Sequence, residues 1–286
     1  MQKLVVGSVA SDRPAGATCI FCDVAGPLTK EHVWANWLEP FIPRDAKQYT
    51  VLKAVARLDR STFATSVRGE DIHKWQVRCV CADCNNGWMS QLQSEAKEAV
   101  IQLLRGDKCV LDGNAQGRVA AWIAMAVMAG DAADRTNRAV AKEDCLFFKR
   151  CKGPPLNWRI AIGDLERGEW PAYWIRHPFQ IVEKLPEDGN RAITAYNAQF
   201  TSFVTGRLFA HVSVAPPGTK QLHVPALPSA EQKMRQLWPP IRKRIEWPPS
   251  PLSGVDADAI AGAGMNRLAR IGAAIRHSEL DTPTGE

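Results

Sequence analysis

The sequence lacks an apolar run long enough to cross a lipid bilayer. Its longest apolar stretch, Val119 to Gly130, is well short of the roughly twenty residues that a spanning helix requires. The opening residues, MQKLVVGSVASDR, also lack the extended apolar run of a secretory signal. We therefore expect a cytoplasmic protein without a membrane partner, in a reducing compartment where its eight cysteines form no disulfide framework.

Internal repeats and long low-complexity tracts are also missing, which excludes repeat architectures. The 286 residues are 45% hydrophobic and 23% charged, a composition that can bury an ordinary core in two modest domains. The net charge of +6 favours a polyanionic partner such as nucleic acid. Nothing in the sequence indicates an oligomeric state.

Apolar spacing predicts two helices in the middle of the chain. The first runs from Cys84 to Arg105 and is ended by Gly106 and Asp107, and the second is a buried helix from Gln116 to Ala133. Beyond residue 153, runs rich in aromatic and β-branched residues predict strands that form an antiparallel sheet packed against the second helix. These runs cover 158–165, 172–182, 193–200 and 202–214.

The last third of the chain contains two Trp-Pro-Pro units, at 238–240 and 247–249, which flank a basic segment. Proline favours extended backbone, so this part is predicted to form a basic surface strap. A weak helix is expected around 256–276. The predicted fold class is α+β, with a zinc-stapled module at 1–107, an α+β accessory domain at 108–250, and a weakly helical or flexible C-terminal tail at 251–286.

The strongest motif is a pair of CxxC sequences, Cys19 with Cys22 and Cys81 with Cys84. Two-residue spacing lets both thiolates of a pair reach one Zn²⁺, and two pairs complete a closed tetrahedral site. The sequence therefore predicts a structural zinc, which has no open position for catalysis. The alternative is a set of free cysteines or a redox motif. Core packing is predicted for the other cysteines, Cys79, Cys109, Cys145 and Cys151.

Each CxxC pair is followed closely by polar residues. Glu31 and His32 come soon after the first pair, at a predicted strand end, and Asn85 follows Cys84 directly at a helix start. A CxxC pair, Glu-His-Val, and a CxxC-Asn that opens a helix together resemble the HNH endonucleases of the ββα-metal fold. The run from Asn85 to Ser90, the segment Thr205 to Leu208 and the Trp-Pro-Pro units resemble a bacterial and phage-borne subset of that family.

This resemblance implies a DNA-cleaving hydrolase in which His32 is the general base and Glu31 and Asn85 hold a catalytic Mg²⁺ or Mn²⁺. The residue types suit that chemistry, because histidine titrates near neutral pH and oxygen ligands are preferred by Mg²⁺. The zinc would clamp the strand that carries the base against the helix that carries the metal ligand. Asn85 could instead cap the helix, and Asn86 could exchange roles with it.

The family's middle asparagine, which orients the histidine, has no counterpart here, and Asp71, His73 or Gln76 could replace it. This departure leaves open a second hypothesis, a catalytically impaired zinc module that binds nucleic acid or a protein. Core packing around the zinc is predicted for Trp34, Trp37 and Trp88. Basic residues that could contact phosphates are Lys30, Arg68, Lys74, Arg78, Arg242, Lys243 and Arg244.

Overall fold

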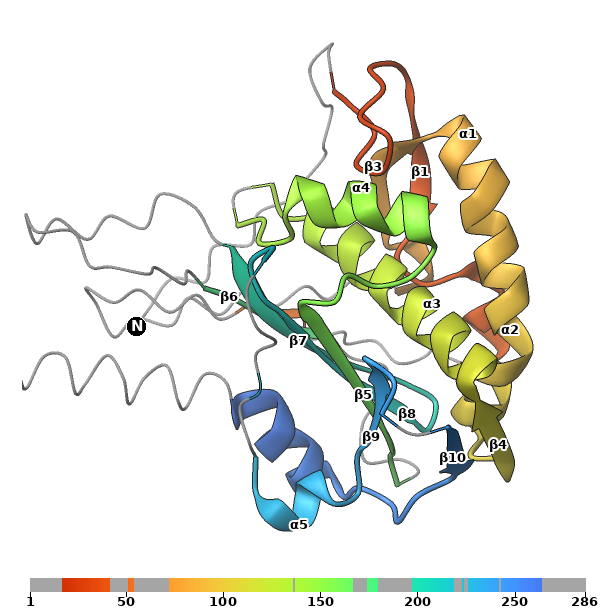
Figure 1. Ribbon diagram of the computed structural model, residues 1–286, viewed down its shortest axis with the longest axis vertical. Helices are drawn as coiled ribbons and strands as arrows, with labels where there is room; N and C mark the ends of the chain where they lie inside the picture. The colour runs from red at the N-terminus through yellow and green to blue at the C-terminus, as the bar shows by residue number, and fades with distance from the viewer. Residues whose placement is uncertain are drawn as a thin grey trace, which may run out of the picture.

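The computed structural model describes residues 17–41, 51–53, 72–135, 137–166, 174–179, 197–218, 223, 226–241 and 243–263. Helices and strands are both abundant within these residues, so the chain belongs to the α+β class (Figure 1). None of the described helices has the length and apolar character needed to traverse a bilayer.

The cysteine pairs lie in a small unit of two strands and a helix. Strand β1 (Leu28–His32) pairs antiparallel with β3 (Gln76–Cys81), and β3 leads directly into α1 (Ala82–Cys84). One wide π-helical turn, η3 (Asn85–Met89), joins α1 to α2 (Ser90–Arg105). The predicted helix over 84–105 is thus confirmed, and Gly106 ends it in the left-handed conformation, at φ 72°. Short 3-10 turns flank the strands, η1 (Asn36–Phe41) and η2 (Ile72–Lys74).

A six-stranded sheet forms the centre of the molecule, in the order β2-β6-β7-β8-β5-β9. Its strands are β2 (Val51–Lys53), β5 (Trp158–Asp164), β6 (Trp174–Phe179), β7 (Ala198–Thr205), β8 (Leu208–Val214) and β9 (Arg235–Trp238). The predicted antiparallel pairing is confirmed for β5 to β9. It is wrong at one edge, where β2 pairs parallel with β6. That strand has only three residues and comes from the N-terminal third of the chain, outside the apolar runs that indicated strands.

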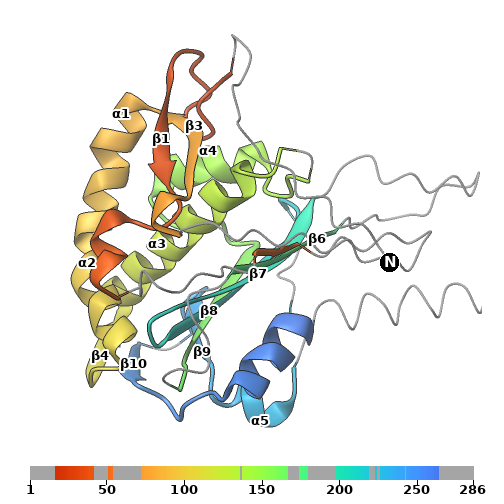
Figure 2. The same cartoon turned by 180° about the vertical axis from the view of Figure 1, so that it is seen from behind.

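Helix α3 (Gly113–Ala132) lies between the sheet and α2 (Figures 1 and 2). It is buried on almost every side from Val119 onward, as predicted for this segment. It begins three residues earlier than predicted because the Asp112 carboxylate caps it, accepting a hydrogen bond of 2.8 Å from the Ala115 N–H. Helix α4 (Lys142–Cys151) was not predicted, since only three of its residues are buried and its apolar pattern is short.

The opposite face of the sheet is covered by α5 (Pro228–Glu231) and a helical segment at 254–263, the described part of the helix expected over 256–276. These elements enclose a second, smaller core. The predicted basic strap is confirmed in part. Ile241, Lys243 and Arg244 are exposed, but the flanking Trp-Pro-Pro units are anchored in strands: the first begins with the last residue of β9 and the second with the last residue of β10 (Arg244–Trp247), which pairs with β4 (Cys109–Asp112). Ile245 and Trp247 are buried, because the strand turns alternate side chains inward.

The main core is continuous from the cysteine unit to the sheet. Trp34, expected beside the zinc, instead packs edge-on against Trp174 and Phe203 of the sheet, with ring centroids 5.8 Å and 5.1 Å away. Trp88 does pack at the first cysteine pair, where its ring meets Phe21 at 5.1 Å. Aromatic packing therefore joins the unit that holds the cysteine pairs to the sheet. The domain boundaries predicted at residues 107 and 250 stay predictions.

Candidate metal centre and adjoining polar site

The structure brings the two CxxC pairs together. The sulfur atoms of Cys19, Cys22, Cys81 and Cys84 all lie within 4.8 Å of one another, and those of Cys22 and Cys81 are 3.6 Å apart. A tetrahedron of thiolates around Zn²⁺ with bonds of about 2.3 Å has sulfur–sulfur edges of roughly 3.8 Å. The four thiols therefore form a cluster that could bind a metal ion such as zinc.

Backbone hydrogen bonds hold the first cysteine pair in a tight turn. The N–H of Asp23 donates to the Cys19 carbonyl at 2.9 Å, and the N–H of Ile20 donates to the Cys79 carbonyl at 2.9 Å, which ties the turn to β3. The side chain of Phe21, between the two cysteines, is fully buried. The local fold thus presents two thiols on one side of the turn and an apolar anchor on the other.

Burial disfavours the ionised form of one thiol in the cluster. Burial raises the pKa of the Cys84 thiol to about 12, so its thiolate is strongly disfavoured unless a positive charge lies nearby. A bound metal ion would supply that charge and displace the protons. The remaining cysteines divide as follows. Cys79 and Cys145 are buried as predicted, Cys109 is half-buried, and Cys151 is exposed at the end of α4, which contradicts its predicted core role.

Asn85 joins the helix to β1. Its Nδ2 donates to the Thr29 hydroxyl at 3.0 Å and to the Lys30 carbonyl at 3.3 Å. Both bonds use the amide nitrogen, so within the described residues Oδ1 makes no hydrogen bond. Asn85 does not cap the helix, because it has helical backbone angles and its N–H donates to the Ala82 carbonyl. Asn86 is exposed, so the contact with β1 belongs to Asn85.

Glu31 points from β1 toward α2. The residue is 5% exposed, and its carboxylate accepts a hydrogen bond of 3.2 Å from Gln93 Nε2. Burial raises the pKa of Glu31 to about 7, and the bond from Gln93 offsets only part of that effect. The carboxyl group is therefore poised between its neutral and ionised forms near neutral pH. A cation placed beside it would favour the ionised form.

His32 leaves β1 on the other side. Consecutive strand residues point to opposite faces, and His32 contacts Gln76, its exposed partner on β3, with 2.5 Å between the two Nε2 atoms. Gln76 thus makes the contact expected of the missing asparagine, whereas His73 lies in η2 and Asp71 is outside the described residues. Partial burial, followed by the nearby charge of Lys30, lowers the pKa of His32 and favours the neutral imidazole.

Two of the predicted phosphate-binding residues share this outer face. Lys30 and Arg78 are paired across β1 and β3 in the same register as His32 and Gln76, and both are exposed. Lys74, Lys243 and Arg244 are also exposed, while Arg68 and Arg242 lie outside the described residues. The outer face of the strand pair is therefore basic around the histidine.

The structure thus joins the predicted residues only in part. It gathers the four cysteines, and it brings Asn85 to β1 and Glu31 to α2 on the helix-facing side. His32 contacts neither Glu31 nor Asn85 through a hydrogen bond among the described residues. The sequence reading missed Thr29 and Gln93, although Thr29 lies two residues before Glu31 and so shares its face of the strand.

Comparison with known protein families, with curated proteins and with solved structures gives no match to this chain.

Proposed function

We propose that this chain is a metal-dependent nuclease of the HNH type, in which a zinc-bound ββα unit hydrolyses phosphodiester bonds in DNA. The observation that carries the proposal is the gathering of Cys19, Cys22, Cys81 and Cys84 within 4.8 Å. This cluster fastens the strand that bears Glu31 and His32 to the start of the helix that bears Asn85. The proposal thus explains why two distant CxxC pairs each precede polar residues.

Glu31 and Asn85 supply the oxygen ligands in this scheme. Both lie on the helix-facing side of β1, and the two hydrogen bonds from Asn85 Nδ2 leave its Oδ1 available to a hard cation. Mg²⁺ or Mn²⁺, when bound, would neutralise charge on the phosphate and on the leaving oxygen. Because the pKa of Glu31 is raised to about 7, a cation competes with a proton for this carboxylate near neutral pH, so metal binding should strengthen as the pH rises.

His32 acts as the general base and Gln76 as its positioning residue. The lowered pKa of His32 keeps the imidazole neutral at working pH. The reaction requires the Gln76 amide to be turned so that its oxygen accepts the Nε2–H, which frees Nδ1 to take a proton from water. Because His32 is the last residue of β1, a phosphate placed at the end of the strand can be reached by side chains from both faces of the strand. Lys30 and Arg78 would hold the DNA backbone beside it.

A plasmid assay tests the proposal. Supercoiled DNA is incubated with the protein and Mg²⁺ or Mn²⁺, and nicked product is quantified for the wild type, His32→Ala, Asn85→Ala and the matched variant Asn86→Ala. Nicking should be lost in the first two variants and kept in Asn86→Ala, whose side chain is exposed. Nicking that survives His32→Ala, or a wild type inactive with every divalent metal, would refute catalysis by these residues.

One observation favours a second candidate, a zinc module that binds nucleic acid without cleaving it. Glu31 and His32 leave β1 on opposite faces, and their hydrogen bonds go to Gln93 and Gln76 rather than to a shared site. Such a module would bind DNA through the basic outer face. Salt-dependent binding without nicking, weakened by Lys30→Gln and Arg78→Gln and unchanged in Asn85→Ala, would identify it.

A further inference from the structure

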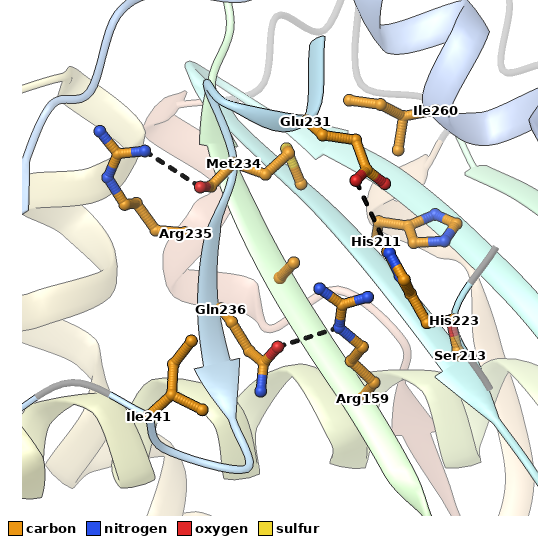
Figure 3. A pocket seen from close by; sticks show the side chains of 11 residues that line it. Arg159, His211, Ser213, His223, Glu231, Met234, Arg235, Gln236, Ile241 and Ile260 are labelled. Atoms are coloured by element: carbon orange, nitrogen blue, oxygen red, sulfur yellow. Dashed lines mark hydrogen bonds and ion pairs between the residues drawn. The ribbon is translucent and has the colours of Figure 1, made fainter. Parts of the chain in front are cut away.

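A second polar site lies on the face of the sheet that is turned away from α3. Along β5, Ile160 and Ile162 face the main core, so Arg159 and Ala161 face the other way. On β8, His211 and Ser213 point to the same side as Arg159. The small helix α5 and the segment at 254–263 cover this face only in part and leave a cavity of about 160 Å³ (Figure 3).

Arg159 brings a positive charge to this cavity without an acidic partner at contact distance. Its Nε donates to Gln236 Oε1 at 3.0 Å, and no described carboxylate lies within ion-pair distance of its guanidinium. The nearest relevant acid, Glu231, accepts a hydrogen bond from the Ala226 N–H at 3.0 Å and lies 3.6 Å from His223. The two outer nitrogens of Arg159 are therefore available to an anion.

His211 adds a neutral donor beside this charge. Its Nδ1 is 2.8 Å from the Ser202 hydroxyl, and its ring stacks on Phe200 with centroids 6.0 Å apart. Burial, aided by the charges of Arg159 and His177, lowers the pKa of His211 to about 4, so the ring is neutral near pH 7. When Ser202 donates to Nδ1, the ring proton is on Nε2, which can donate a hydrogen bond to a ligand.

The rest of the lining is mixed: the polar residues Ser213, His223, Glu231, Arg235 and Gln236 alternate with apolar side chains that suit an organic group. Ala161, Met234, Ile241 and Ile260 line the cavity around the polar residues. Figure 3 shows the side chain of Arg235 directed away from Arg159, on the far side of β9, where its Nη1 donates to the carbonyls of Gln232 and Met234. A cationic anchor, a neutral donor and apolar side chains thus meet in one partly open cavity, whose lining acid, Glu231, is engaged by the Ala226 N–H and faces His223.

We propose that this cavity binds a small organic oxyanion, a phosphate monoester or a carboxylate, with Arg159 as its charged anchor and His211 as a second donor. The site is separate from the cysteine cluster, since it lies across the sheet from α3 and uses none of the same residues. A ligand in this cavity would bind on the face of the sheet opposite to the proposed nuclease site.

Isothermal titration calorimetry at pH 7 tests the site with four probes, inorganic phosphate, acetate, phenyl phosphate and benzoate. Phenyl phosphate should bind the wild type more tightly than inorganic phosphate, or benzoate more tightly than acetate. The tighter of the two aromatic probes shows whether the site prefers a phosphate or a carboxylate. Arg159→Gln should weaken that binding by about tenfold or more, as expected for the loss of a charge-assisted contact. The matched variant Arg150→Gln should change it less than about twofold, because Arg150 is exposed on α4 and does not line the cavity.

Two results would overturn the inference. One is the absence of binding by all four probes at millimolar concentration. The other is equal weakening in Arg159→Gln and Arg150→Gln, which would mean that the anions respond only to overall charge. Circular dichroism of both variants verifies that they are folded. If Arg159→Gln fails to fold, His211→Gln replaces it and should weaken binding while leaving the charge of the cavity unchanged.

Discussion

Two glycines of the same helix should respond in opposite ways to replacement by alanine. Gly130 of α3 lies against Trp174, and a Cβ added there would be 2.6 Å from the Cζ2 atom of the indole ring. The ring cannot easily move, since it stacks on Phe203 at 5.3 Å and meets the edges of Trp34 and Trp75 at 5.8 Å and 5.3 Å. Gly117, also in α3, has open space where its Cβ would be.

The magnitudes follow from two opposing effects. Alanine stabilises a helix interior by about 1 kcal/mol relative to glycine, and overpacking of a well-filled core costs about 1–3 kcal/mol. A contact as short as that at Gly130 belongs at the upper end of this range, so Gly130→Ala should lower the free energy of unfolding by about 2 kcal/mol. Gly117→Ala should raise it by up to about 1 kcal/mol.

Urea denaturation followed by far-ultraviolet circular dichroism measures both variants against the wild type. The expected difference between the two substitutions is about 3 kcal/mol, which corresponds to several degrees in Tm for a chain of this size. If Gly130→Ala is as stable as Gly117→Ala, Trp174 does not pack against α3 in the described way. Trp174 would then not join the sheet to the elements packed on it.

Further predictions concern the metal cluster, a buried ion pair and an imidazole. Elemental analysis should find one zinc per chain. At a zinc concentration about a hundred times the Kd for zinc, removing the metal with a chelator, or losing its site through Cys81→Ser, should lower the free energy of unfolding by about 3 kcal/mol. The control Cys151→Ser, at an exposed cysteine, should have no effect. Arg176→Met should cost about 3–5 kcal/mol in urea denaturation, because it leaves the fully buried Asp131 carboxylate without its main partner; a loss below 1 kcal/mol would contradict the buried pair. The pKa of His211 is lowered to about 4 in the folded state, so the unfolded chain binds the proton first and stability is lost as pH falls from about 6.5 toward 4. This group alone should remove about 2 kcal/mol at pH 5, and His211→Gln should flatten that part of the pH profile.

The cysteine cluster could be predicted from the sequence because its information is local. Each CxxC pair fixes two ligands within one turn of chain, and in a reducing compartment two such pairs are explained together by one ion. Strand β1 and the helix after Cys84 could likewise be predicted from the residues within each segment. Alternation along the predicted strand already places Glu31 and His32 on opposite faces. What the sequence could not provide is which face turns toward α2 and which toward solvent, and this follows only from the packing of the helix on β1.

Other features depend on contacts between distant parts of the chain. Gln93 became a partner of Glu31 only because α2 packs across β1, and β2 is too short to carry a strand signal. The cavity around Arg159 is formed by the three neighbouring strands β8, β5 and β9 together with α5 and the segment at 254–263, none of which carries a distinctive motif. Such sites arise from strand order, and strand order is decided by the packing of the whole core rather than by any segment.

The parallel addition of β2 at the sheet edge bears on how this protein can be divided for experiments. A fragment that starts at residue 108 would lose both β2 and Trp34, and so would expose the backbone edge of β6 together with one face of Trp174. Open strand edges beside bare aromatic rings promote intermolecular pairing. The fragment 108–286 expressed alone should therefore aggregate. Co-expression of residues 1–107 as a separate chain should increase the yield of soluble fragment, because it supplies β2 to pair with β6.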